Sequence, residues 1–377
     1  MTPFEQQILD LIQDAFPLVE RPYKALAEML NCGGECAANL AVSEQDVFDA
    51  VEGLRSSGVI RRIGGVYDSK KLGFISRLCA GKVPVSSLDF SAEPHAQTSM
   101  EKFASVVNEV SAITHNYIRS HEYNVWFTVI ALNEDEIQTI IDVLYVTTNL
   151  HDVHVMSATR KFKINTVMSL DKRRETRDER GTALCFDKLS TGESSGTLSP
   201  TSCHPERSAE STKSRNLTES DKLRIRTSCG DIPHSLTPFK DWGVPCEELR
   251  EDIASKRMRR FGAILRHQNA GFAFNAMVCF KLDSRRETRD ERVKSVVSQA
   301  GSLLASNPHI SHCYERLSFE GFPYNVYAMM HANSAELLSQ YVADSVNDLN
   351  SLQSSPVDYV VLHSVRELKK TSFKFFV

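Results

Sequence analysis

The sequence has no long apolar run, no excess of basic residues and no cysteine spacing typical of a metal site. No stretch approaches the roughly 20 apolar residues that a membrane-spanning helix requires. The 44 Lys and Arg residues face 48 Asp and Glu residues, so the net charge is −4 and no basic field attracts nucleic acid or anionic lipid. The first residues, MTPFEQQILDLIQDAF, are amphipathic and acidic, unlike a signal peptide. We expect a cytoplasmic protein with no membrane partner.

The nine cysteines are odd in number and scattered along the chain. Cys32 and Cys36 stand four residues apart, but no second pair of Cys or His residues follows at a zinc-like spacing. Reduced thiols explain this pattern better than a structural zinc. With 377 residues, 41% of them hydrophobic and 24% charged, the chain is typical of a globular protein of two or three domains.

Residues 1–68 are predicted to form a winged helix-turn-helix. Phe4, Ile8 and Ile12 share one helical face, and a second short helix begins at Pro22. A third helix is expected to follow the N-cap Ser43 and to end near Gly58, before a wing strand at 59–68.

Residues 69–168 carry the pattern of a ferredoxin-like domain. Strands are expected at 75–85, 114–127 (a strand pair) and 154–162, with helices at 100–110 and 135–144. The order β-α-β-β-α-β leaves one face of the sheet for helices and the other for a ligand or a partner.

Residues 169–240 are rich in Ser, Thr, Arg and Glu, and we predict a mostly disordered linker. The octapeptide RRETRDER stands at 173–180 and again at 285–292. These positions are not equivalent in the two halves of the chain, so the repeat looks separately inserted, and a solvated spacer is the simplest role.

The second half of the chain repeats the first. RRFGAI at 259–264 matches RRIGGV at 61–66, and a second βαββαβ pattern follows. We predict a truncated winged-helix remnant at 241–262, because its first two helices are not evident, and a second ferredoxin-like domain at 263–377. The fold class is therefore α+β, duplicated in one chain. Two copies imply an intramolecular pseudo-dimer with an interface between the sheets, and a homodimer of whole chains is also possible.

The most informative stretches are THNYIRSHEYNVWF, from Thr114, and SHCYERLSFEGFPYNVY, from Ser311. Alternate residues of a strand share a face, so each stretch aligns an imidazole, a phenol and a guanidinium. These two His–Tyr–Arg rows consist of His115, Tyr117 and Arg119 in the first half, and His312, Tyr314 and Arg316 in the second.

Such rows suit a large polycarboxylate that carries a metal. Guanidinium groups bind carboxylates in bidentate fashion, imidazole binds iron, and Trp126 or Tyr327 offers an aromatic surface to a flat ring. A metallo-tetrapyrrole fits this set. The alternative is that the same residues cap strand ends and form surface ion pairs.

A winged helix followed by a ferredoxin-like domain resembles the Lrp/AsnC family of transcription regulators. A recognition helix needs Arg, Lys, Asn or Gln at base edges. The positions expected to point outward are mostly acidic, which makes DNA an unlikely partner: Glu44, Gln45, Asp46, Phe48, Asp49 and Glu52 in the first copy, and Glu247, Glu248, Glu251 and Asp252 in the second.

Five longer motifs resemble the siroheme decarboxylase family more closely. RPYKALAEML, GVIRRIGGVYDSKKLGF and THNYIRSHEYNVWFTVIA are similar to its first subunit; RRFGAILRHQNAGFAFNAMVCFKL and SHCYERLSFEGFPYNVYAMMHA are similar to its second. The resemblance covers most of 1–165 and about 255–368 and implies a fusion of the two subunits. It implies loss of CO2 from two acetate side chains of siroheme, giving 12,18-didecarboxysiroheme for haem or haem d1 synthesis.

The family motif falls on the two His–Tyr–Arg rows and on further residues implied to contact substrate: Tyr123, Asn124, Tyr324, Asn325, Arg259, Arg260 and His267. Trp126 is expected to contact the ring because of its aromatic surface. We expect His115, His312 or His267 to ligate the substrate iron, and another histidine, Tyr117 or Tyr314 to supply a proton. No added cofactor is expected, because the macrocycle delocalises the electrons. A DNA-binding regulator and a haem-binding sensor or carrier without turnover remain alternatives.

Overall fold

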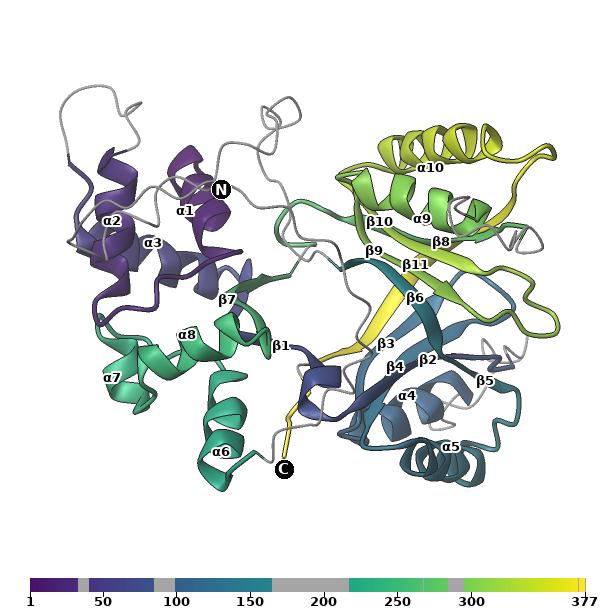
Figure 1. The fold of residues 1–377 in the computed structure, drawn as a ribbon, viewed down its shortest axis with the longest axis horizontal. Helices are drawn as coiled ribbons and strands as arrows, with labels where there is room; N and C mark the ends of the chain where they lie inside the picture. The colour runs from purple at the N-terminus through teal and green to yellow at the C-terminus, as the bar shows by residue number, and fades with distance from the viewer. Residues whose placement is uncertain are drawn as a thin grey trace, which may run out of the picture.

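The computed structural model describes residues 1–32, 41–84, 99–164, 217–266, 268–283, 295–371 and 373–376. His267, both RRETRDER copies and most of the predicted linker lie outside the described residues. Figure 1 shows the helices of the two winged-helix regions gathered at one end of the molecule, and the large sheet with the helices that cover it at the other. Among the described helices, none is long and apolar enough to cross a membrane.

The first winged helix forms as predicted. It consists of α1 (Pro3–Ile12), α2 (Pro22–Cys32), α3 (Glu44–Ser56) and β1 (Ile60–Tyr67). Ser43 caps α3 by accepting a hydrogen bond from the Asp46 amide, and the Asp46 side chain returns the bond in a capping box. Gly58 has φ +73°, a conformation that favours glycine, and so turns the chain from α3 into β1.

The prediction of a truncated second winged helix, with a linker extending to 240, is wrong. Two helices, α6 (Glu219–Ser228) and α7 (Pro238–Trp242), precede α8 (Cys246–Ala254) and β7 (Met258–Leu265). In α6 only Ile225 and Ser228 are buried, so the apolar periodicity that marks a helix is almost absent. The capping box between Thr218 and Asp221 was the available signal. Only α7, with five residues, is short.

The two winged helices are joined by an antiparallel ribbon of β1 and β7, in which Gly64 pairs with Gly262. A Cβ at Gly64 would lie 2.1 Å from the Gly230 carbonyl oxygen, and one at Gly262 would lie 2.5 Å from that of Gln13. The matched glycines of RRIGGV and RRFGAI therefore allow close backbone approach. One hydrophobic cluster, including Phe16, Ile63 and Phe261, spans both copies.

Each ferredoxin-like domain has the predicted order of elements. The first contains β2 (Ile75–Gly81), α4 (Ser99–Glu109), β3 (Ile113–Arg119), β4 (Val125–Ala131), α5 (Glu134–Thr148) and β5 (Val153–Met156), after the short 3-10 helix η1 (Ser69–Leu72). The second contains β8 (Phe274–Lys281), α9 (Val296–Ser306), β9 (Ile310–Arg316), β10 (Val326–Ala332), α10 (Ala335–Asn350) and β11 (Asp358–Lys370).

The two domains exchange their last strands. The first part of β11 pairs with β8 of its own domain, and its second part pairs with β3 of the other domain. Likewise β5 pairs with β2, whereas β6 (Ala158–Ile164), which follows it, pairs with β9. The result is a nine-stranded sheet in the order β5-β2-β4-β3-β11-β8-β10-β9-β6.

The helices cover the outer faces, with α4 and α5 on one side and α9 and α10 on the other, as Figure 1 shows. Two clusters of buried apolar residues lie beneath these helix pairs. A third cluster, which includes Trp126, Met277, Phe322 and Tyr327, draws on both domains. The predicted interface between the two sheets is therefore confirmed, and their helix-free faces meet there.

Candidate functional site

A β-bulge at the start of β3 and another at the start of β9 shape the site. Across β3 and β4, Ile113 pairs with Val129 and His115 with Thr128, so Thr114 is an extra residue. Across β9 and β10, Ile310 pairs with Met330 and His312 with Met329, so Ser311 is extra. A bulge re-aims side chains that would otherwise alternate between faces.

The bulges bring a hydroxyl group next to each predicted histidine. Thr114 Oγ1 lies 2.9 Å from His115 Nδ1, and Ser311 Oγ lies 2.9 Å from His312 Nδ1. A hydrogen bond at Nδ1 orients the imidazole and selects its tautomer. The sequences THN, from Thr114, and SHC, from Ser311, contain these hydroxyl groups. Their position next to the imidazole depends on the bulges, which the sequence does not reveal.

The two predicted His–Tyr–Arg rows form. The guanidinium carbon of Arg119 lies 5.3 Å from the ring centre of Tyr117, and that of Arg316 lies 4.9 Å from the ring centre of Tyr314. The rings of His312 and Tyr314 are nearly parallel, with centres 6.3 Å apart. Burial raises the pKa of both phenols, and Glu367 raises that of Tyr117 further.

Each arginine of the rows is anchored by a strand of the other half of the chain. Arg119, which is 5% exposed, donates from Nη1 to the Leu362 carbonyl oxygen at 3.0 Å and to Ser364 Oγ at 3.1 Å. Arg316 donates from Nη1 to the Met156 carbonyl oxygen at 3.2 Å. Burial lowers the pKa of Arg119 to about 10, so the group stays cationic at neutral pH. These cations lie deep between the sheets.

The ribbon of β1 and β7 adds two further arginines at matching positions. Arg61 donates to the Lys370 carbonyl oxygen, and it lies within electrostatic range of Glu367 and Tyr117. Arg259 forms an ion pair with Asp68, with Nη2 3.0 Å from Oδ2, and its charge partly offsets the burial that raises the pKa of Tyr314. Both side chains therefore face the sheet where the His–Tyr–Arg rows begin.

The next residue of each ribbon strand has a structural role. Arg62 donates to the Gly230 and Gly65 carbonyl oxygens at 3.3 and 3.4 Å. Arg260 donates to the carbonyl oxygens of Gln13 and, at 3.3 Å, Ala263. Adjacent residues of a strand point to opposite sides, so only the first arginine of each RR pair faces the rows.

Lys370 lies close to both rows. It pairs with His115 across β11 and β3, and its charge also acts on His312. Burial lowers the pKa of His312 to about 4, with Arg259, Lys370 and Lys163 acting in the same direction. Burial also lowers the pKa of Lys370 to about 8. The half-buried His312 is thus a neutral imidazole among cations, a setting suited to an anionic ligand.

Sequence reasoning missed Lys370, Glu367, Asp68 and Lys163 because they come from strands and turns of the other copy. The alternating charges of VRELKK, at 365–370, were the available signal, and these residues form the last part of β11, which continues to Lys370.

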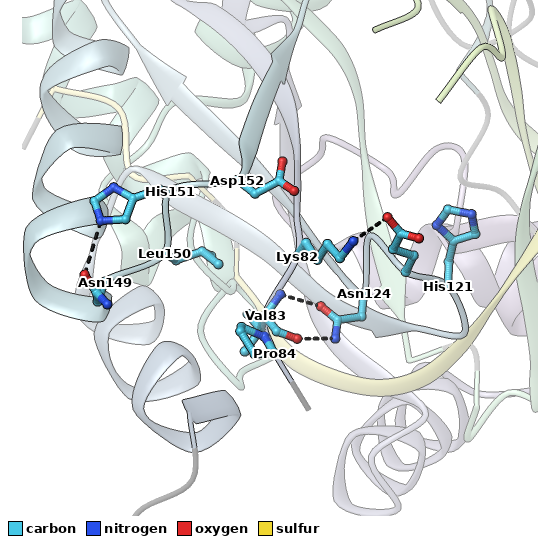
Figure 2. Close-up of a pocket in the computed structure, with 10 residues that line it drawn as sticks. Lys82, Val83, Pro84, His121, Asn124, Asn149, Leu150, His151 and Asp152 are labelled. Atoms are coloured by element: carbon cyan, nitrogen blue, oxygen red, sulfur yellow. Dashed lines mark hydrogen bonds and ion pairs between the residues drawn. The ribbon is translucent and has the colours of Figure 1, made fainter. Parts of the chain in front are cut away.

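Asn124 and Asn325 hold the chain together rather than facing the rows. Asn124 accepts from the Val83 amide at 2.9 Å and donates to the Val83 carbonyl oxygen at 2.8 Å. Asn325 makes the same pair of bonds to Leu282, both at 2.9 Å. Figure 2 shows the Asn124 clamp beside an open hollow lined by Lys82, His121 and Asp152. This hollow adjoins the chain end of β3 opposite to His115 and contains no member of the rows.

The three aromatic candidates pack in the interface cluster. Trp126 is 1% exposed, donates from Nε1 to the Tyr123 carbonyl oxygen at 2.7 Å, and packs against Phe322. Tyr123 is 6% exposed, and Tyr324 packs edge-on against Phe322. Their predicted contact with substrate stays a prediction. His267 lies outside the described residues, among which no cluster of three or more His, Cys, Asp or Glu suits a metal ion.

The helices expected to face DNA differ from the prediction at two positions. Phe48 packs against Tyr23, with ring centres 5.1 Å apart. Asp252 is fully buried and forms ion pairs with Arg224 at 3.2 Å and Arg257 at 2.8 Å. In α3, Gln45, Asp46 and Asp49 remain exposed, so the surface left to meet a phosphate backbone has no basic residue at these positions.

Two family models match the chain. One, described as an AsnC-like ligand binding domain, matches residues 71–163 and 269–369. The other, described as a siroheme decarboxylase NirDL-like HTH domain, matches residues 5–37. The repeated match coincides with the two ferredoxin-like domains, and the second match lies in α1 and α2.

Individual relatives cover either the whole chain or one half. Siroheme decarboxylase of Hydrogenobacter thermophilus is 27% identical, over 98% of this chain and 94% of that protein. For Desulfovibrio desulfuricans, the siroheme decarboxylase alpha subunit is 38% identical over 45% of this chain and 86% of its own length. The beta subunit is 34% identical over 43% of this chain and 99% of its own length.

Among solved structures, the chain is similar to the siroheme decarboxylase NirDL in co-complex with an iron-uroporphyrin III analogue. The TM-score is 0.59 at 24% identity, covering 98% of this chain and 94% of that one. This likeness confirms the duplicated fold over nearly the whole length.

Proposed function

This chain belongs to the siroheme decarboxylase family, and we propose that it removes CO2 from siroheme with a site built jointly by its two halves. The observation that carries the proposal is the pair of His–Tyr–Arg rows, each beginning beneath an arginine of the β1–β7 ribbon. Relatives of each half are named as separate subunits of this enzyme, which supports a functional pairing of the halves.

Cationic groups from both halves bind the substrate. Siroheme is a polycarboxylate, and Arg61, Arg259 and Lys370 lie where the rows begin. A charged hydrogen bond to a carboxylate contributes about 1.5–3 kcal/mol. Burial lowers the pKa of His312, and the charges of Arg259 and Lys370 add to this effect; carboxylates placed among these cations would offset their part of it. The solved relative bound to an iron-uroporphyrin III analogue is consistent with a tetrapyrrole-sized ligand.

The reaction requires a sink for electrons and a source of protons. When an acetate loses CO2, the electron pair of the broken C–C bond passes to the CH2 carbon and into the macrocycle. One proton must then reach that carbon to form the methyl group. His115 and His312 are the side chains suited to the two remaining tasks, coordination of the substrate iron and proton donation. Their Nδ1 hydrogen bonds orient both rings for those tasks.

The experiment is anaerobic incubation of the full chain with siroheme, followed by mass spectrometry. Loss of two CO2 units supports the decarboxylase. Unchanged siroheme with a spectrum of iron ligation would instead support a sensor or carrier. Failure to bind siroheme would instead support the DNA-binding regulator.

A further inference from the structure

The two rows differ in what lies behind the histidine. In the second half, Ser311 Oγ lies 2.9 Å from His312 Nδ1 and also 2.8 Å from His331 Nε2. The three side chains form a continuous chain of hydrogen bonds. Ser311 Oγ also lies 3.4 Å from the Met329 carbonyl oxygen, a contact too long to compete with the two shorter ones.

Among the described residues, the first half has an isoleucine where the second half has His331. The His331 amide donates to the His309 carbonyl oxygen on the strand beside it, and the Ile130 amide makes the equivalent bond to Ala112, at 3.1 and 2.9 Å. Ile130 therefore occupies the position of His331. The Thr114 hydroxyl lies within hydrogen-bonding distance of His115, but the isoleucine at the third position has a hydrocarbon side chain that cannot carry a proton.

The neighbourhood of His331 ties it to the interface between the halves. His331 pairs with Asn275 across β10 and β8. Asn275 Oδ1 accepts from Ser364 Oγ at 2.5 Å, and Ser364 Oγ accepts from Arg119 at 3.1 Å. Asn275 is 6% exposed and Ser311 is 9% exposed, so polar contacts here are little weakened by water.

We propose that His331 is a positioning residue which, through Ser311, supplies the proton that His312 passes to the substrate. The second half then provides the proton donor, and His115 of the first half is left to coordinate the substrate iron. This inference rests on the proposed decarboxylation.

For one acetate, the three side chains supply the single proton that the CH2 carbon needs, and no other reactant is required. His312 gives its Nε2 proton to the CH2 carbon as its Nδ1 takes the Ser311 hydroxyl proton. Ser311 takes a proton from Nε2 of His331, and this step requires His331 to begin doubly protonated and to end neutral. His312 thus never becomes an anion. A solvent proton taken up at His312 Nε2, with the reverse shift along the chain, restores the starting state before the second acetate reacts.

The test compares wild type with His331→Ile in anaerobic single turnover with siroheme. Isoleucine already stands at the equivalent position in the first half, so the sheet accommodates it. We expect siroheme affinity within about two-fold and an unchanged ligation spectrum. The rate of methyl formation should fall at least about ten-fold, within the usual range for general acid catalysis. The slowdown in D2O should increase, because proton delivery becomes limiting.

Two further variants keep the test decisive. His331→Ala should regain rate with added imidazole, which a purely structural role would not permit. His363→Gln removes an exposed histidine of β11 and should leave the rate unchanged. A wild-type rate and solvent isotope effect in His331→Ile, or a loss confined to KM, would overturn the inference alone. Wild-type protein that binds siroheme and releases no CO2 would overturn the proposed function as well.

Discussion

Chemically matched residues acquire different properties in the two halves. His115 and His312 hold the same place in their rows. On the neighbouring strand, however, equivalent positions are occupied by Ile130 in the first half and by His331 in the second. Glu367 pairs with Tyr117, whereas Lys161 pairs with Tyr314. The rows are thus equivalent in backbone and unequal in charge, which is why the two histidines can perform different tasks.

Replacing Arg259 should weaken substrate binding. We expect Arg259→Gln to raise KM for siroheme about ten-fold or more, since one charged hydrogen bond contributes about 1.5–3 kcal/mol, with a smaller effect on kcat. Steady-state kinetics under anaerobic conditions provide the measurement. Arg160→Gln, which removes a partly exposed ion pair with Glu315, serves as the control. Equal KM values for the two variants would contradict the role of Arg259.

The pKa of His312 makes stability depend on pH. The folded protein holds that pKa at about 4, below the ordinary value of 6.5. The unfolded chain therefore binds the proton more readily, and stability falls as the pH drops from about 6.5 towards 4. We expect His312→Gln to lose less stability than wild type over this interval. Urea unfolding at pH 7 and pH 4.5 checks this, and parallel losses in both proteins would show that His312 is not responsible.

At the level of elements, the asparagines of the YN pairs fix the chain that follows a neighbouring strand. The side chain of Asn124 hydrogen-bonds both the N–H and the C=O of Val83, and that of Asn325 does the same with Leu282, as the backbone of a paired strand would. We expect Asn124→Ala and Asn325→Ala to cost about 1–3 kcal/mol each, because buried backbone groups lose their partners. Denaturant unfolding gives the values. A large loss of siroheme binding without loss of stability would instead restore their predicted contact with substrate.

The same asparagines show where sequence reasoning stops. The repeated letters H-Y-R and Y-N identified two matching motifs, and period-2 alternation correctly placed the rows on strand faces. The sequence pattern could not distinguish a side chain that contacts a ligand from one that hydrogen-bonds the backbone. It also missed α6, whose buried face is nearly limited to Ile225 and Ser228. The strand exchange could not be predicted from the sequence, because Glu367 and Lys370 come next to β3 only through pairing between distant parts of the chain.

At the level of the whole molecule, the exchanged strands make each half dependent on the other. We expect residues 1–164 and 217–377, produced together as separate chains, to associate and retain decarboxylation, because β6 and β11 pair across the halves. Size-exclusion chromatography and single-turnover assays test this. Each half alone should lack activity. An active isolated half would show that the site does not need both.

The winged helices should not bind DNA. Their exposed α3 positions include Asp46 and Asp49, and Arg55 is engaged by Glu52 at 3.2 Å and by Asp231. Like charges facing phosphates oppose binding. We expect no salt-sensitive shift of a DNA probe at micromolar protein, measured with and without siroheme. A shift that weakens steeply with salt would favour the regulator.

The exchange of strands between unequal halves has a consequence for assembly. If the halves were separate chains, two first halves could pair and would contain two copies of the Ile130 arrangement and no His331. A single polypeptide supplies both halves in a fixed one-to-one ratio and holds them near each other at any dilution. The covalent link therefore favours pairing of unlike halves without any dedicated recognition surface. The yield of mispaired products then depends on the rate of pairing within one chain and not on the relative amounts of two separate chains.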